Sequence, residues 1–105
     1  MADIESTTNS RIKGLVRLRK RRERDSTGLF LVEGERELES ALRGHEVLEL
    51  YVCEELLTEH GARVYRSVVG AGEIPIISVT EPVLEKISLR GNPSGFVAVL
   101  RQWEA

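Results

Sequence analysis

Positive charge is concentrated near the start of the sequence. The run from residue 11 to residue 24 reads RIKGLVRLRKRRER and holds eight of the chain's 15 basic residues beside one acidic residue, Glu23. Eight basic and three acidic side chains give residues 1–24 a net charge of +5, whereas seven basic and 14 acidic side chains give residues 25–105 a net charge of −7. Clustered guanidinium and ammonium groups bind polyanions, and such a cluster is a typical electrostatic signature of nucleic-acid binding.

These basic residues are spaced so that most of them share one side of a helix. Apolar residues recur at helical spacing between Arg11 and Arg24, and five cations fall on the opposite side with no acidic residue among them: Lys13, Arg17, Lys20, Arg21 and Arg24. Like charges on one face repel each other unless a polyanion lies against them. We therefore favour contact with RNA or DNA over a solvated charged face or an anionic membrane surface. Docking on an acidic protein is the alternative of a different class.

Other site chemistries find little support in the sequence. The single cysteine, Cys53, lies in an apolar strand-like run, and His45 and His60 stand far apart in no metal-ligand spacing. The stretch Gly70-Ala71-Gly72 lacks the third glycine of a dinucleotide-binding loop and follows a helix instead of a strand. We therefore predict no catalytic, cofactor or metal site in this chain.

Two shorter stretches are also candidates for ligand contact. Glu33-Gly34-Glu35-Arg36 lies where a strand ends and a helix begins, a place where open α/β sheets gather binding groups. The loop Arg90-Gly91-Asn92-Pro93-Ser94-Gly95 offers polar side chains beside two glycines, which allow close approach of a phosphate or sugar. For the first stretch, the alternative is that its carboxylates merely stabilise a helix N-terminus. For the loop, the alternative is a plain turn.

Helical and strand-like patterns alternate along the rest of the chain. We expect helices over 11–24, 35–42, 54–69 and 81–87, the third with an interruption near His60-Gly61 left open, and strands over 29–32, 47–53, 75–79 and 95–100. This order predicts a three-layer α/β/α domain with helices on both faces of a mainly parallel sheet. Residues 1–10 are expected to form a flexible N-terminus, 11–101 the domain, and 102–105 the start of a linker. No apolar run is long enough to span a membrane, and the one cysteine agrees with a cytoplasmic location.

Three blocks of the sequence together resemble a known family. They are the polar run STTNSRIK at residues 6–13, the stretch GLFLVEGER at 28–36 followed by ESAL at 39–42, and NPSGFVAV at 92–99. The chain resembles the N-terminal substrate-binding domain of SpoU/TrmH-type RNA 2′-O-ribose methyltransferases, in the SPOUT class. In one departure, Ser94 stands where relatives often have glutamine.

The resemblance implies a fold like that of ribosomal proteins that bind kink-turn RNA. It further implies that catalysis and S-adenosylmethionine binding belong to a knotted catalytic domain absent from this chain. The expected partner is structured RNA, in particular ribosomal RNA, with the isolated domain a monomer and the full-length parent a homodimer. The residues expected to contact RNA are Arg11, Lys13, Arg17, Lys20, Arg21, Arg24, Arg36, Arg90, Asn92 and Ser94.

Overall fold

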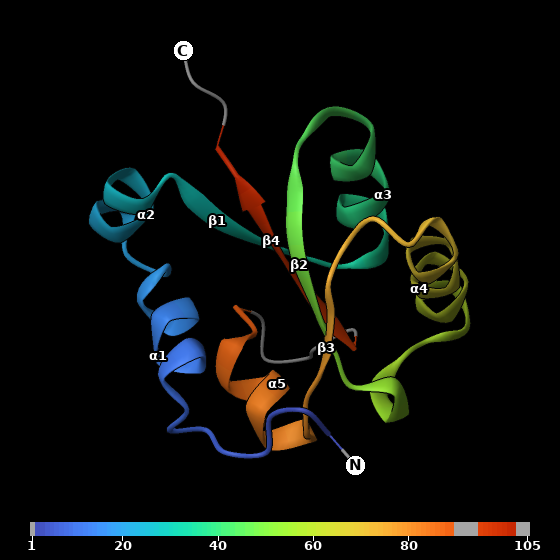
Figure 1. Cartoon of the computed structure of the whole chain (residues 1–105), viewed down its shortest axis with the longest axis horizontal. Helices are drawn as coiled ribbons and strands as arrows, with labels where there is room; N and C mark the ends of the chain where they lie inside the picture. Colours follow the sequence, from blue (N-terminus) through green and yellow to red (C-terminus); the bar gives the residue numbers. More distant parts are fainter. Residues whose placement is uncertain (1, 90–94, 103–105) are drawn as a thin grey trace.

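The last strand of the chain lies inside the sheet, between two strands that precede it in sequence (Figure 1). The computed structural model describes residues 2–89 and 95–102. Its four-stranded sheet has the order β1-β4-β2-β3. The strands are β1 (Leu29–Glu33), β2 (Val47–Val52), β3 (Ile76–Ser78) and β4 (Phe96–Arg101).

The expectation of a mainly parallel sheet is wrong. β4 is antiparallel to both β1 and β2, and only the β2-β3 pair is parallel. The element between β3 and β4 explains this difference. α5 (Glu81–Ile87) has seven residues, about 10 Å of helix at 1.5 Å per residue, so it is too short to carry the chain back along the sheet. β4 therefore begins at the same end of the sheet at which β3 finishes, and it runs in the opposite direction.

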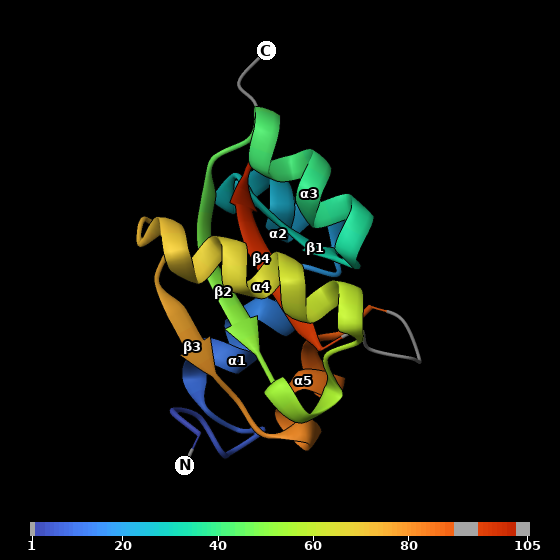
Figure 2. The same cartoon turned by 90° about the vertical axis from the view of Figure 1, so that its right-hand side faces the viewer.

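Helices cover both faces of the sheet, as the sequence predicts (Figure 2). α1 (Ser10–Arg17) and α5 pack on one face, with α2 (Arg21–Thr27) beside β1; α3 (Glu35–Gly44) and α4 (Glu59–Ala71) pack on the other. Side chains alternate along β4: Val97 and Val99 enter the core beneath α1 and α5, while Ala98 and Leu100 enter the core beneath α3 and α4. The three-layer α/β/α prediction is confirmed.

The basic run does not form one helix, and the prediction of a continuous helix over 11–24 is wrong. α1 ends at Arg17, Lys20 takes an extended conformation, and α2 begins at Arg21. Arg24 Nη1 donates hydrogen bonds to the carbonyls of Leu18 at 2.9 Å and Arg19 at 2.8 Å. The guanidinium thereby satisfies carbonyls that a continuous helix would have bonded internally. This local side-chain contact accompanies a break in a run of residues that otherwise has good helix propensity.

Within the N-terminal segment that was expected to be flexible, residues 3 and 4 pack beside the end of β3. Ile4 is buried and forms a parallel bridge with Val79. Its N–H donates to the Ser78 carbonyl at 3.1 Å, and the Asp3 carboxylate accepts from the Ser78 N–H at 2.9 Å. The expected linker at 102–105 lies, apart from Gln102, outside the described residues.

The expected helix over 54–69 is divided. The 3₁₀ turn η1 (Glu54–Leu56) precedes α4, and the Thr58 hydroxyl caps α4 by accepting from the Gly61 N–H at 2.9 Å. Within the described residues, no helix is long and apolar enough to cross a lipid bilayer.

Candidate nucleic-acid interface

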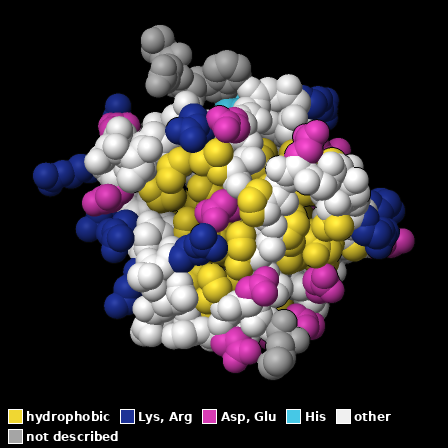
Figure 3. Space-filling view, in the orientation of Figure 1, with side chains coloured by type: hydrophobic (Ala, Val, Ile, Leu, Met, Phe, Trp, Pro, Cys, Tyr) yellow, Lys and Arg dark blue, Asp and Glu magenta, His cyan; other side chains and the backbone are white. Residues whose placement is uncertain are grey.

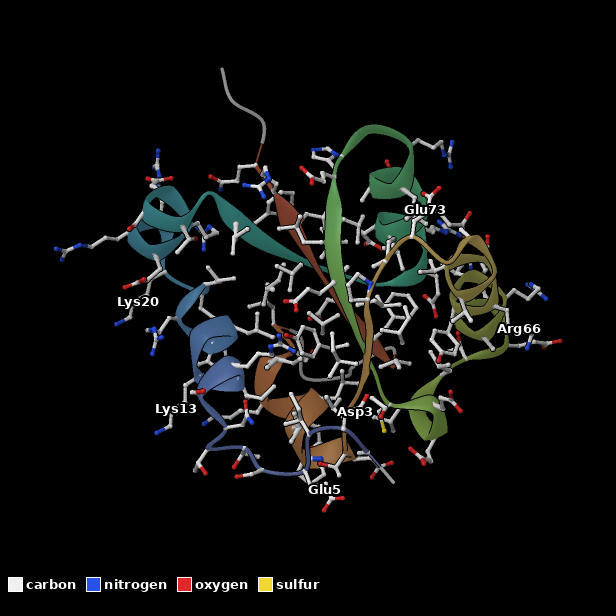
Figure 4. The ribbon with its side chains drawn as sticks, viewed as in Figure 1. Asp3, Glu5, Lys13, Lys20, Arg66 and Glu73 are labelled. Atoms are coloured by element: carbon white, nitrogen blue, oxygen red, sulfur yellow. The ribbon has the colours of Figure 1, made fainter. Side chains whose placement is uncertain are left out.

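The exposed cations of α1, α2 and the connection between them lie along one edge of the molecule. Figure 3 shows Lys and Arg side chains gathered on the left, over these two helices. Lys13 projects from α1 and Lys20 from the connection, both to the same side and away from the sheet (Figure 4). We call the surface formed by Lys13, Arg17, Lys20, Arg21 and Arg22 the basic edge; all five residues are exposed.

The basic edge arises from both helices despite the break between them. Asn9 caps α1, its side-chain oxygen accepting from the Arg11 N–H at 2.9 Å, so α1 starts in a fixed place. Ile12, Leu15 and Leu18 are buried against the sheet and α5. Burial of these apolar residues turns the basic residues between them outward, toward solvent.

Two of the predicted contact residues make intramolecular contacts instead of joining the basic edge. The Arg11 guanidinium lies 3.7 Å from the Glu49 carboxylate of β2. Arg24 is partly buried and holds the carbonyls at the end of α1. Arg21 has only an exposed ion pair with Asp25 at 3.7 Å, which leaves it accessible.

Arg19 and Lys86 are two basic residues that did not enter the predicted set. Arg19 Nη2 donates to the carbonyls of Lys86 at 2.6 Å and Ser88 at 3.3 Å, which fastens the α1–α2 connection to the end of α5. Lys86 is exposed beside α1. No local pattern could have found these contacts, because 67 residues separate Arg19 from Lys86.

The second predicted stretch places a buried carboxylate at the end of β1. Glu33 accepts from the Ser88 hydroxyl and from the Leu89 N–H, the latter at 2.7 Å. Gly34, with φ +97°, then turns the chain into α3, where Arg36 is exposed in the first turn. Glu33 therefore has a structural role, and Arg36 is the group of this stretch that can meet a ligand.

The predicted loop residues Arg90, Asn92 and Ser94 lie outside the described residues. Gly95, which follows them, is buried at φ +102°, and its carbonyl accepts from the Cys53 N–H at 2.9 Å. A Cβ at this position would lie 2.8 Å from the backbone nitrogen of Leu57. Glycine is required here by both the backbone conformation and the close approach.

Several described side chains have pKa values that their surroundings shift away from the ordinary value. A hydrogen bond from the Thr58 hydroxyl lowers the pKa of Glu35, and burial raises the pKa of Tyr51 far above its ordinary value. Burial also raises the pKa of the Cys53 thiol to about 11. No group of three or more potential metal ligands occurs among the described side chains.

Comparisons with known proteins agree with the described architecture. A family model described as MRM3-like substrate binding domain matches residues 9–98. The solved structure of an RNA 2′-O ribose methyltransferase is similar with a TM-score of 0.84 and 43% identity, over 96% of this chain and 38% of that chain. An rRNA methyltransferase from Sinorhizobium meliloti has a TM-score of 0.73 and 25% identity, over 98% of this chain and 39% of that chain.

A further solved structure supports the fold alone. The SpoU methyltransferase AviRb from Streptomyces viridochromogenes, in complex with AdoMet, has a TM-score of 0.76 at 24% identity, over 91% of this chain and 36% of that chain. No protein of curated function matches the sequence. The chain thus spans less than two fifths of the length of each solved relative described here.

Proposed function

The chain belongs to the family of MRM3-like substrate-binding domains, and on that premise we propose that it binds structured RNA for an S-adenosylmethionine-dependent 2′-O-ribose methyltransferase. The resemblance to the N-terminal domain of SpoU/TrmH methyltransferases, drawn from sequence blocks, is confirmed by the family model and by the solved relatives. In the proposed division of labour, this domain recognises the RNA and a catalytic domain carries out methyl transfer.

The basic edge is the single observation that carries this proposal. Lys13, Arg17 and Lys20 are exposed and have no carboxylate partner among the described residues. Side chains held apart on two helices can reach successive phosphates of an RNA backbone, and each contact releases condensed counterions. Arg36 and the loop that contains Arg90, Asn92 and Ser94 form the second part of the proposed surface.

The finer assignments follow from the relatives. The rRNA methyltransferase from Sinorhizobium meliloti was also solved with AdoMet bound, at 26% identity to this chain, which supports ribosomal RNA as the target and S-adenosylmethionine as the cofactor of the catalytic domain. No cofactor is assigned to this chain. We further propose a cytoplasmic protein, monomeric as the isolated domain and homodimeric as the full-length parent.

Fluorescence anisotropy of labelled ribosomal-RNA hairpins, over a salt series and with duplex DNA as competitor, tests this function. We expect binding that weakens with salt at a slope equivalent to about four to six phosphate contacts and that resists DNA competition. The variant R17E/K20E/R21E should lose at least about tenfold in affinity at low salt.

A matched control reverses the same amount of charge elsewhere. Arg43, Arg63 and Arg66 are exposed on α3 and α4, on the opposite side of the sheet. R43E/R63E/R66E changes the net charge equally and should retain most of the RNA affinity. Equal losses in both variants, or no RNA binding by the parent chain at low salt, would reject the proposal. Docking of the basic edge on an acidic protein would then become the favoured function.

A further inference from the structure

A pocket of about 370 Å³ lies on the basic edge, where α1, α5 and the turn before α1 meet. Its lining consists of Thr7, Thr8, Lys13, Val16, Arg17 and Lys86. Lys86 comes from a helix that begins more than 60 residues after α1 ends. The pocket therefore exists only in the folded domain and has no counterpart in the linear basic run.

The charged residues that line this pocket are all basic. Lys13, Arg17 and Lys86 contribute three cations, and no carboxylate of the described residues pairs with any of them. The two threonines add hydroxyl groups; Thr8 Oγ1 lies 2.8 Å from Ser6 Oγ. The residues that line the pocket thus carry ammonium, guanidinium and hydroxyl groups, which can donate separate hydrogen bonds to the oxygens of a tetrahedral oxyanion.

Hydrogen bonds and apolar packing outside the pocket fix the segments that carry its lining residues. Arg19 fixes the carbonyl of Lys86 at 2.6 Å and thereby ties the end of α5 to the α1–α2 connection. The turn that carries the threonines is closed by the Asn9 N–H, which donates to the Ser6 carbonyl at 3.2 Å. Val83, Leu84 and Ile87 bury the inner side of α5 in the same core cluster as Ile12 and Leu15. The backbone positions of the lining residues are therefore set before any ligand arrives.

We propose that this pocket binds one phosphate group of the RNA backbone, with Lys86, Thr7 and Thr8 as binding residues beside Lys13 and Arg17. The inference rests on the proposed function and adds a defined anchoring point to it. Other cations of the basic edge, such as Lys20, contribute to attraction over a broad surface. The pocket instead fixes one phosphate relative to α1 and α5, which orients the RNA on the domain.

The first test compares RNA binding by the parent chain with binding by Lys86→Gln. Loss of one phosphate contact should lower the affinity by roughly threefold to tenfold at low salt and make the slope of log K against log salt shallower by about one. Glu85→Gln changes the neighbouring exposed residue of α5 and serves as the control. Because only the backbone carbonyl of Lys86 takes part in the contact with Arg19, the variant should keep the parent's midpoint of thermal unfolding.

The second test uses inorganic phosphate as the probe. In ¹H–¹⁵N spectra of the parent chain, added phosphate should shift the signals of Thr7, Thr8 and Lys86 in a saturable manner, and Lys86→Gln should abolish saturation. Signal shifts that grow without saturation would overturn the proposed phosphate site. Shifts of equal size at the signals of Arg43 and Arg66 would also overturn it.

Failure of this inference differs from failure of the proposed function. If R17E/K20E/R21E loses RNA binding while Lys86→Gln keeps the parent's affinity and salt slope, the phosphate pocket is wrong and the function stands. If the parent chain binds inorganic phosphate in this pocket but no RNA, the RNA function fails. If the variant Lys86→Gln loses an acidic protein partner instead, a carboxylate and not an RNA phosphate occupies the pocket.

Discussion

The hydroxyl of Ser88 lies 3.1 Å from each carboxylate oxygen of Glu33, across 55 residues of sequence. Both residues are buried, and the Leu89 N–H donates to the same carboxylate at 2.7 Å. Glu33 ends β1, and Ser88 follows α5 directly. This pair therefore ties the end of an edge strand to the segment that leads toward β4.

Replacement of Glu33 should destabilise the fold. Glu33→Ala leaves the Ser88 hydroxyl and the Leu89 N–H without their acceptor in a buried place, so we expect the free energy of unfolding to fall by about 1–3 kcal/mol. Urea denaturation followed by circular dichroism measures the change. Glu46→Ala removes an exposed carboxylate that pairs with Arg101 and should cost less than about 1 kcal/mol. Equal losses in the two variants would show that the Glu33 contacts add no stability.

Substitution of Arg24 should lower the stability of the fold, whereas substitution of Arg22 should weaken RNA binding. Arg24→Gln removes the donor to the carbonyls of Leu18 and Arg19, and we expect a loss of about 1–2 kcal/mol in the free energy of unfolding. Arg22 is exposed, so Arg22→Gln should leave stability unchanged within about 0.5 kcal/mol and weaken RNA binding instead. A stable Arg24→Gln variant would contradict the capping role of this guanidinium.

The two arginines also show where sequence patterns stop being informative. Apolar spacing correctly placed the buried side of α1 on Ile12 and Leu15 and correctly left the cations outside. It could not locate the break before Arg21, because that break depends on a side chain folding back from α2. The residue types near Lys86 gave no signal either, since its neighbours in the pocket come from the far end of the sequence.

The order of strands is a second property that local patterns left undetermined. β1, β2 and α5 were predicted within a residue or so of their actual bounds. Alternation of strand and helix normally accompanies parallel strands, yet the length of α5 decides the direction of β4. The contact of Asp3 with Ser78 likewise joins residues far apart in the sequence. The polar run of serines and threonines that follows Asp3 gives no indication of it.

Alanine at position 95 should be poorly tolerated. The added Cβ would lie 2.8 Å from the Leu57 backbone nitrogen, and the residue would keep a positive φ that alanine disfavours. We expect a loss of at least roughly 2 kcal/mol in the free energy of unfolding, measured in urea. Gly70→Ala, in α4 with open space around it, should by contrast be neutral or stabilising.

The pH dependence of stability should contain a contribution from Glu35. The Thr58 hydroxyl lowers the pKa of this carboxyl below its ordinary value of 4.5. The hydrogen bond therefore stabilises the fold above the ordinary pKa, and that stability is lost as the pH falls through the lower folded-state pKa. Glu35→Gln should consequently lose less stability than the parent chain between about pH 5 and pH 3. Parallel stability profiles for the two proteins would contradict this assignment.

Cys53 should react slowly in the folded chain. Its thiol is buried, donates to the Glu55 carboxylate at 3.0 Å, and has a pKa raised to about 11 by burial first and by Glu55 second. Since the thiolate is the reactive form, we expect a disulfide reagent at pH 8 to label the native chain roughly 100-fold more slowly than the urea-unfolded chain. Similar rates in both states would show that the thiol is accessible.

The contact between Arg19 and the end of α5 has a consequence for the order of synthesis. The cations of the basic edge leave the ribosome early, but the carbonyls that hold Arg19 belong to Lys86 and Ser88. Until those residues emerge, the nascent chain presents a strongly basic segment that no later element has yet fixed in place. The geometry of the basic edge is thus complete only when most of the domain has been translated, although its cations precede the residues that hold Arg19 by more than 60 positions.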